Sequence, residues 1–262
     1  MKTLEGIFGL IWKLYFAVVF AFFAILFYPF FLTILIREEW NKYGFNLYII
    51  WSWMLRFFCF YRIKVFGEDG KIPNGPYIII ANHTSYLDVF FMYSILPKHP
   101  FAFLGKAEVL KYPIVGTYFK SLNIPVYRGD KTKAGKSYHL SAKAVAKGWS
   151  LAIFPEGGIP DYQCPKMIPF KDGAFKLAKS LNIPILPLTF TNNYKLFSDP
   201  TEILGPARPG TVKVHIHQAI PVEKIQNMEI AELRQMCFDL INEPILNEHP
   251  ELRESFETKL SV

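Results

Sequence analysis

The stretch IIIANHTSYLD, residues 78–88, joins an apolar run to two residues that can carry chemistry. A continuous apolar run of this length is typical of a strand that is covered on both faces, as in the parallel sheets of α/β proteins. The residues that follow predict a helix over Ser85–Leu96, ended by Pro97. His83 is then expected in the strand-to-helix turn, and Asp88 in the first helical turn, after an N-cap at Thr84 or Ser85.

The turn decides whether His83 and Asp88 can meet. On one straight helix, residues five apart point about 140° away from each other. After a chain reversal the imidazole can lean over the first helical turn, where the carboxylate accepts from one ring nitrogen and leaves the other as a base. This is the orienting half of a Ser-His-Asp triad, and a substrate hydroxyl could supply the missing nucleophile. A structural histidine at a helix start would show the same short pattern.

Short β-rich runs alternate with helical stretches after Arg62. This alternation predicts one α/β domain with a mixed sheet over residues 62–262. Strands are expected at 63–67, 77–81, 101–105, 123–127, 150–154, 184–190 and 211–217. Helices are expected at 85–96, 107–120, 133–147, 173–181 and about 230–240, with a polar tail after Pro244.

The preceding segment, residues 1–61, is strongly apolar. Residues 14–36 contain no charged side chain, and only Arg56 interrupts residues 45–61. The segment is too long for a signal peptide and has no small-residue cleavage site. Its length suits a helix that spans a bilayer, whereas Pro29 and the second apolar stretch suit two helices in one leaflet. Both interpretations predict a membrane motif that packs chiefly against lipid, so that removing residues 1–60 leaves the body folded.

The net charge of +7 is concentrated between Lys98 and Lys147, where ten Lys or Arg residues accompany two acids. Such a window suits anionic lipid, a phosphorylated substrate or an acidic protein, or it forms a solvated basic face. No nucleic-acid-binding motif accompanies it. The three cysteines, Cys59, Cys164 and Cys237, form no C-x-x-C pair, which fits a reducing compartment and excludes a zinc or disulfide framework.

A second loop of interest has the sequence FPEGG, residues 154–158, directly after an expected strand. Glycines allow close approach of the backbone to a ligand, and their N–H groups can face an anion, although most such stretches are ordinary turns. His215 and His217 alternate on one strand face. No third ligand stands at a suitable spacing, so we expect no metal site.

Taken in order, the motifs resemble the four sequence blocks of the glycerolipid acyltransferase family, whose best-known members are lysophosphatidic acid acyltransferases. The resemblance covers roughly residues 64–220. The blocks are Asn82-His83-x-Ser85-x-x-Asp88, then GKAEVLKYPIVGTYFKSLNIPVYRGD (105–130), FPEG (154–157) and PFKDGAFKLAKSLNIPILPLTF (169–190).

The resemblance implies a mechanism without an acyl-enzyme. His83, oriented by Asp88 and supported by Asn82 and Ser85, takes the proton from a lipid hydroxyl that attacks an acyl thioester directly. The chain has no G-x-S-x-G elbow, which agrees with this mechanism.

The resemblance also implies residues that bind the acceptor. Arg128 is expected to hold its phosphate, since a guanidinium suits a bidentate anion contact. Glu156 and Gly157 are expected to position its glycerol end. Lys106 and Lys171 are further candidates, although either can simply belong to the basic face.

The implied enzyme is bound to the cytoplasmic face of the cell membrane. It moves an acyl group from acyl carrier protein or acyl-coenzyme A to the sn-2 hydroxyl of lysophosphatidate, giving phosphatidate in phospholipid synthesis. No cofactor, metal or nucleic acid is implied. The expected partners are the acyl donor, the lyso-lipid acceptor and an anionic membrane surface.

One departure from the family concerns the acceptor. The third block usually continues with threonine, arginine and serine, whereas Gly158, Ile159 and Pro160 stand here. Either Arg128 and the basic window compensate for the lost arginine, or the acceptor is a lyso amino-acid lipid that lacks a phosphate. A thioester hydrolase that uses the same dyad on water is a further alternative.

Overall fold

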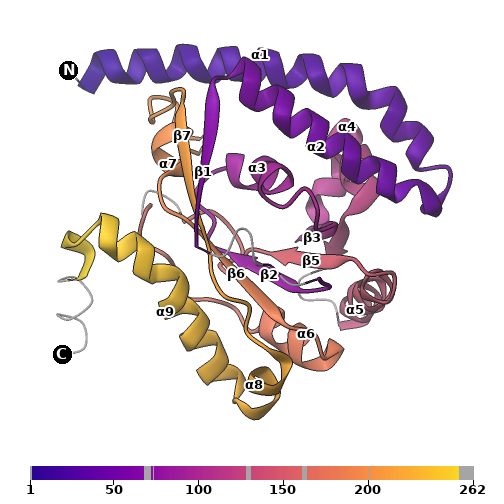
Figure 1. Cartoon of the computed structure of the whole chain (residues 1–262). Helices are drawn as coiled ribbons and strands as arrows, with labels where there is room; N and C mark the ends of the chain where they lie inside the picture. The colour runs from indigo at the N-terminus through magenta and orange to yellow at the C-terminus, as the bar shows by residue number, and fades with distance from the viewer. Residues whose placement is uncertain are drawn as a thin grey trace.

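A seven-stranded sheet forms the centre of the molecule (Figure 1). The computed structural model describes residues 2–67, 72, 74–127, 131–160, 164–199 and 201–253. The strand order is β1-β7-β6-β2-β5-β3-β4, and only the β6–β7 pair is antiparallel, so the predicted mixed α/β sheet is confirmed. The strands are β1 Tyr61–Gly67, β2 Ile78–Ala81, β3 Phe101–Lys106, β4 Ile124–Val126, β5 Ser150–Ile153, β6 Ile185–Phe190 and β7 Gly210–Ile216.

The helices follow the predicted pattern apart from one split, one extension and two short helices, Asn193–Leu196 and Val222–Asn227, that the sequence did not predict. The expected helix at 107–120 is split, because Pro113 starts a new helix and holds Tyr112 in an extended conformation. The last helix continues through Pro244 to Glu248, since the residues around the proline, Ile241 and Ile245 among them, are buried against the core. The helices are α1 Lys2–Ile34, α2 Asn41–Phe58, α3 Leu87–Ile95, α4 Pro113–Leu122, α5 Lys131–Ala146, α6 Gly173–Leu181, α7 Asn193–Leu196, α8 Val222–Asn227 and α9 Ile230–Glu248, with short 3₁₀ turns at Glu38–Trp40 and Ala107–Lys111.

Two hydrophobic clusters cover the two faces of the sheet. Ile79 and Ala81 of β2 point into the cluster formed with α1, α2, α3 and α4. Ile78 and Ile80 point into the opposite cluster, formed with α6, α8 and α9 (Figure 1). Every residue of β2 is therefore buried, which explains why this strand reads as an unbroken apolar run.

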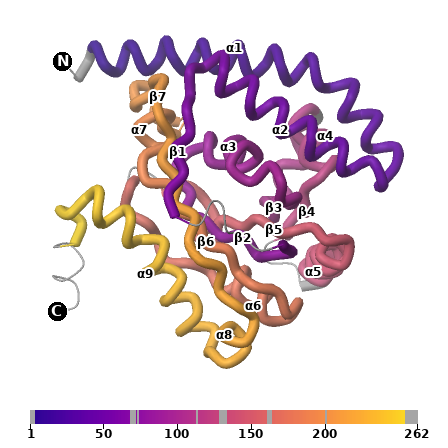
Figure 2. Tube along the Cα trace, viewed as in Figure 1, coloured from indigo at the N-terminus to yellow at the C-terminus, as the bar shows by residue number. Residues whose placement is uncertain are grey.

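The two N-terminal helices share the first of these clusters. Phe31 of α1 and Trp51 and Leu55 of α2 are at most 1% exposed and belong to the cluster that contains Ile79 and Phe101 of the sheet. Figures 1 and 2 show α1 lying along the top of the body with α2 beneath it. The expectation that these helices pack chiefly against lipid is therefore wrong for α2 and for the inner face of α1. The domain boundary between residues 61 and 62 stays a prediction.

The outer face of α1 is apolar and exposed. Val18, Phe22 and Ile25 are each at least 60% exposed. By length and composition, the part of α1 from Leu4 to Ile34 suits a membrane span. Burial of one face by the body leaves only the other face of α1 for contact with lipid.

Polar contacts also tie α1 to the body. The buried Lys13 ammonium donates to Ser198 Oγ at 2.9 Å and to the carbonyl oxygens of Asp199 and Glu202. The preceding residue, Trp12, donates from Nε1 to the hydroxyl of Tyr61, the first residue of β1, at 3.1 Å. These contacts position α1 beside the loop that follows α7.

Candidate active site

Three parallel strands bring the sequence motifs to one edge of the sheet. β2 lies between β5 and β6 and is parallel to both. Asn82-His83 follows β2, Phe154 to Gly157 follows β5, and Asn193 follows β6. Because the carboxyl ends of parallel strands meet at one edge, these loops face one another, as at the ligand sites of open α/β sheets.

His83 and Asp88 are in direct contact. His83 Nδ1 lies 3.0 Å from Asp88 Oδ2, and the same oxygen accepts the backbone N–H groups of Thr84 at 2.6 Å and Ser85 at 2.9 Å. Asp88 is fully buried, and the His83 side chain is 14% exposed. The chain does turn between the two residues, and the carboxylate closes that turn. An ionised acceptor fixes the proton on Nδ1, so Nε2 carries the free lone pair.

The His83 ring is also held by stacking. It lies over the ring of Phe154 with a centroid separation of 4.0 Å and an interplanar angle of 14°. Phe154 stacks in turn on Phe103 at 5.8 Å. The imidazole plane is thus set by the FPEG loop and the tautomer by Asp88. Within the part of the chain that the structure describes, Nε2 has no protein partner, so a substrate can reach it.

The Glu156 carboxylate serves the His83 loop. Its Oε1 accepts the backbone N–H of His83 at 2.8 Å, and its Oε2 accepts that of Ile168 at 3.0 Å. The side chain is 1% exposed, and burial, helped by the charge of Asp88, raises the pKa of Glu156 to about 7. Both oxygens are thus bonded inside the protein and anchor the His83 loop, and the expected contact of Glu156 with the acceptor stays a prediction.

Asn82 and Ser85, the expected supporting residues, are both hydrogen-bonded to the segment that begins at the end of β6. The Asn82 amide exchanges two hydrogen bonds of 2.8 Å with the backbone of Phe190, at the end of β6. Ser85 Oγ donates to the carbonyl of Phe197 at 2.6 Å and accepts from Leu87 N at 3.2 Å. Both residues tie the His83 turn to the segment after β6.

The structure describes three of the four remaining predicted binding residues. Gly157 has φ +82°, a conformation that favours glycine. Lys106 is exposed at the end of β3, and a Cβ added to Gly158 would lie 3.8 Å from its Nζ, so Lys106 lies beside the FPEG loop. Lys171 has an exposed side chain, and its N–H donates to the carbonyl of Pro155 at 2.9 Å. Arg128 lies outside the described residues.

The other candidate histidines and cysteines have ordinary structural surroundings. His217 Nε2 lies 2.8 Å from the hydroxyl of Thr189, and burial lowers the pKa of His217 to about 4. His215 stacks on Phe66 at 4.8 Å. No metal-ligand cluster is found among the residues that the structure describes. Burial raises the pKa of the Cys164 thiol to about 12, which is unsuited to a nucleophile.

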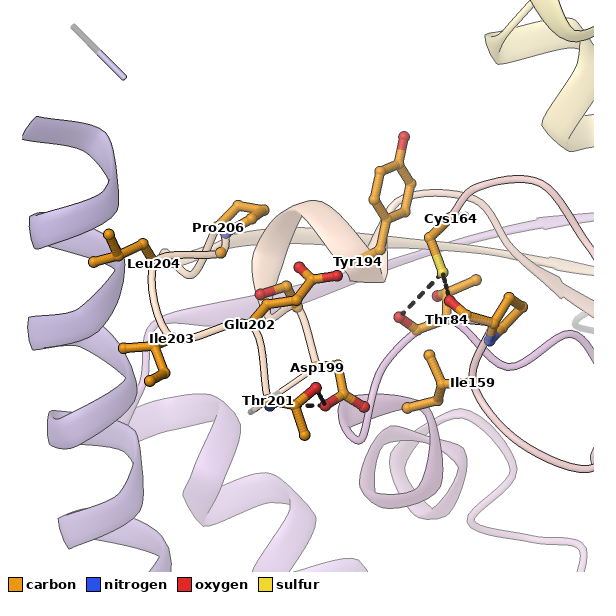
Figure 3. Close-up of a pocket in the computed structure, with 13 residues that line it drawn as sticks. Thr84, Ile159, Cys164, Tyr194, Asp199, Thr201, Glu202, Ile203, Leu204 and Pro206 are labelled. Carbon is orange, nitrogen blue, oxygen red and sulfur yellow. Dashed lines mark hydrogen bonds between the residues drawn. The ribbon is translucent and has the colours of Figure 1, made fainter. Parts of the chain in front are cut away.

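A cavity of about 610 Å³ lies between the turn after β2 and the loop after α7 (Figure 3). Its lining runs from Thr84, the residue after His83, to the loop that contacts α1. Ile159 borders it, together with the acidic side chains of Asp199 and Glu202. Among the described residues that line it there is no lysine or arginine. The described lining therefore offers hydroxyl and carboxylate groups to a substrate next to His83.

Sequence reasoning missed one residue of this site. Asn193, fully buried at the start of α7, donates from Nδ2 to Asp88 Oδ1 at 2.6 Å. It lies 105 positions from Asp88 and outside every motif of the four blocks. No local pattern marks such a contact.

Comparison with known proteins supports the family. The acyltransferase family model matches residues 62–191. A 1-acyl-sn-glycerol-3-phosphate acyltransferase of Saccharomyces cerevisiae is 32% identical over 194 residues, which are 69% of this chain and 62% of that protein. One of Chlamydomonas reinhardtii is 29% identical over 167 residues, which are 63% of this chain and 48% of that protein. The chain thus spans less than two thirds of the length of these relatives.

A solved structure has the same fold. The crystal structure of the 1-acyl-sn-glycerophosphate (LPA) acyltransferase PlsC from Thermotoga maritima superposes with a TM-score of 0.74. It is 21% identical and covers 94% of this chain and 97% of its own. The match extends over the sheet and the N-terminal helices. The family region includes the His83–Asp88 pair and the FPEG loop, so residues 62–191 form a domain of the acyltransferase family.

Proposed function

We propose that this protein transfers an acyl group from a thioester donor to the free hydroxyl of lysophosphatidate and so forms phosphatidate. The observation that carries the proposal is the His83–Asp88 pair, in which Asp88 is buried and His83 Nε2 has no partner among the described residues. The relatives named as 1-acyl-sn-glycerol-3-phosphate acyltransferases support the choice of acceptor.

The chemistry requires one general base and no covalent intermediate. Nε2 of His83 takes the hydroxyl proton while the acceptor oxygen attacks the thioester carbonyl. Collapse of the tetrahedral intermediate breaks the C–S bond, and the imidazolium returns its proton to the departing sulfur. The charge of Asp88 stabilises the imidazolium in between. The net reaction exchanges a thioester for an ester and needs no oxidant or metal.

The acceptor phosphate binds away from the cavity beside Ile159. Asp199 and Glu202 line that cavity, and the Lys13 ammonium beside them already donates to Ser198 and to two carbonyls, so the cavity disfavours an anion. Arg128, at the end of the second block, is the proposed phosphate ligand, and Lys106 beside the FPEG loop adds positive charge. Lys171 stays a weaker candidate, because its side chain is exposed.

The reaction takes place at a membrane surface, which we place on the cytoplasmic face. The lyso-lipid acceptor and its two-tailed product both reside in a leaflet, and the exposed apolar face of α1 suits contact with that leaflet. The donor is acyl carrier protein or acyl-coenzyme A, which present the same thioester. An anionic surface is matched by the basic window at 98–147.

The test is an acyl-transfer assay with the purified full chain. Lysophosphatidate is offered with each donor in turn, beside a lyso amino-acid lipid without phosphate. We expect phosphatidate as the product, and His83→Ala should lower turnover by about 10²- to 10⁴-fold, the usual effect of losing a positioned general base. Thioester loss without lipid product, or preference for the phosphate-free acceptor, would contradict the proposal, as would near-normal turnover in His83→Ala.

A further inference from the structure

The Asp88 carboxylate has two differently used oxygens. Oδ2 accepts from His83 Nδ1 and from the backbone N–H groups of Thr84 and Ser85. Oδ1 accepts from Asn193 Nδ2 at 2.6 Å, the one donor recorded for it among the described residues. Asp88 and Asn193 are both 0% exposed. Within the described structure, the Asn193 amide therefore supplies Oδ1 with the hydrogen bond that water would supply to a surface carboxylate.

The orientation of the Asn193 amide is set by this contact. An ionised carboxylate only accepts hydrogen bonds, so the amide must turn its NH₂ group toward Asp88. As a result the Asn193 side-chain oxygen is buried without a hydrogen-bond partner in the described structure. A buried polar atom without a partner is costly and calls for a reason. A residue needed only to fill this space would be apolar, so the amide is explained by its bond to Asp88.

The surrounding structure holds Asn193 rigidly. The neighbouring Asn192 donates to the carbonyl of Thr211 at 2.8 Å and accepts from Lys213 N at 2.9 Å, which fastens the start of α7 to β7. The carbonyl of Asn193 accepts from Phe197 N at 2.9 Å, and the carbonyl of Phe197 accepts from Ser85 of the dyad loop. The Asn193 amide is therefore directed at Asp88 by a segment that is hydrogen-bonded both to β7 and to the loop that carries His83.

We propose that Asn193 is a positioning residue of the active site, which holds the Asp88 carboxylate in the orientation that keeps His83 in the Nδ1–H form. Asn193 lies two residues beyond the matched family region at 62–191. The inference rests on the proposed function in so far as His83 is the general base. Loss of the amide donor would leave Oδ1 buried without a partner, and the carboxylate would then turn away or take up a proton. Either change weakens its hold on the imidazole.

The first test is a double-substitution cycle in acyl transfer. We expect Asn193→Leu to lower kcat by about 10- to 100-fold, as for other residues that orient a reacting group through its partner, with little change in KM. In a His83→Ala background the same substitution should cause no further loss, because the group it orients is gone. Asn192→Ala is the matched control, since it loosens α7 from β7 without touching Asp88. An equal loss from Asn193→Leu in both backgrounds would overturn the inference.

The second test needs no acyl acceptor. The full chain, labelled with ¹⁵N-histidine and held in detergent micelles, should show the His83 ring protonated at Nδ1, with the signal assigned by its absence in His83→Ala. Asn193→Leu should shift the ring toward mixed tautomers, whereas Asn192→Ala should not. Should Asn193→Leu fail to fold, Asn193→Asp has the same size and replaces the donor by an acceptor. An unchanged His83 spectrum in the folded variant overturns the inference, whereas an inactive wild type with the expected spectra would contradict only the proposed acyl transfer.

Discussion

At the residue scale, His83 is positioned by one residue of α3 and two residues of the FPEG loop. Asp88 bonds its ring, Phe154 stacks on its face and Glu156 accepts its backbone N–H. Each of these contacts acts on a different degree of freedom: the tautomer, the ring plane and the path of the chain. Substitution of each should therefore give a different functional defect.

Glu156→Gln should destabilise the protein by about 1–3 kcal/mol, because a buried backbone N–H then faces the amide NH₂ instead of an oxygen. Activity should fall as well, since the His83 backbone loses its anchor. Urea unfolding and acyl transfer measure the two effects. Lys171→Gln, a substitution of an exposed side chain on the adjoining segment, is the control and should leave stability within about 0.5 kcal/mol.

The same carboxyl group predicts a pH dependence. Burial raises the pKa of Glu156 to about 7 from the ordinary 4.5, so its contribution to stability is complete below pH 4.5 and is lost as the pH rises through about 7. The stability deficit of Glu156→Gln should thus be largest near pH 5 and shrink toward pH 8. Comparison with wild type at each pH cancels the opposite trend from His217, whose pKa is lowered to about 4. A deficit that stays constant from pH 5 to 8 would contradict this assignment.

Recognition of the acceptor phosphate predicts that substitutions at Arg128 and at Ile159 have different effects on the KM for lysophosphatidate. Arg128→Ala should raise the KM for lysophosphatidate by about 10- to 150-fold, the effect of one lost charge-assisted contact of about 1.5–3 kcal/mol. Ile159→Arg should leave KM unchanged or lower it, because Asp199 and Glu202 lie in the same cavity and would pair with the new guanidinium. Lys147→Ala, a basic residue that pairs with Glu38 at 2.8 Å, is the control. Equal KM values for Arg128→Ala and Lys147→Ala would remove Arg128 from the phosphate site.

At the element scale, α1 is fastened to the active-site side of the body by one cation. Lys13 is 9% exposed and donates to Ser198 and to two backbone carbonyls of the loop that lines the cavity. The helix on the membrane side and the cavity beside His83 thus share a loop. Displacement of α1 would alter that loop directly.

Lys13→Met keeps the aliphatic length but removes the three donors. We expect it to lower the free energy of unfolding by about 1–3 kcal/mol, because Ser198 and the partly buried carbonyls of Asp199 and Glu202 lose a partner. Tyr15→Phe is the matched control on the same helix, since its hydroxyl bonds the carbonyl of Phe58 at an exposed position. Thermal unfolding compares the two. A Lys13→Met protein as stable as Tyr15→Phe would show that the hydrogen bonds of Lys13 do not hold α1 on the body.

At the scale of the whole molecule, the core extends from the sheet into the N-terminal helices. Trp51 contacts Phe20 and Phe27 of α1, Phe90 of α3 and Tyr118 of α4 in one aromatic cluster. Removal of residues 1–60 therefore exposes core, and we expect the truncated body to aggregate rather than to remain folded in solution.

Two tryptophans on α2 separate core packing from membrane contact. Trp51 is 1% exposed and Trp53 is 54% exposed. Trp51→Ala should cost about 3–5 kcal/mol of stability, as expected for a large side chain lost from a core. Trp53→Ala should stay within about 1 kcal/mol, yet lower co-sedimentation with anionic vesicles. Urea unfolding and vesicle binding give the two readouts, and equal losses of stability would contradict the packing described here.

The local sequence was sufficient for the strand–turn–helix that carries the dyad. An apolar run buried on both faces, a polar break and a helix with an acid in its first turn are set by neighbours along the chain, so β2, the His83 turn and α3 followed from residues 78–96. The mixed sheet followed from the alternation of strands and helices. The break at Pro113 was equally local and was overlooked, whereas the passage of α9 through Pro244 depends on packing.

Only the tertiary structure decided which groups pack against each apolar helix face and which partners each buried polar side chain bonds. An apolar helix face has the same sequence whether lipid or a sheet covers it, so the burial of Trp51 was not readable from α2 itself. The use of both Glu156 oxygens inside the protein depends on the backbone of two other segments. The bond from Asn193 to Asp88 joins residues 105 positions apart, and such a contact leaves no mark in local spacing because chain topology alone brings the two together.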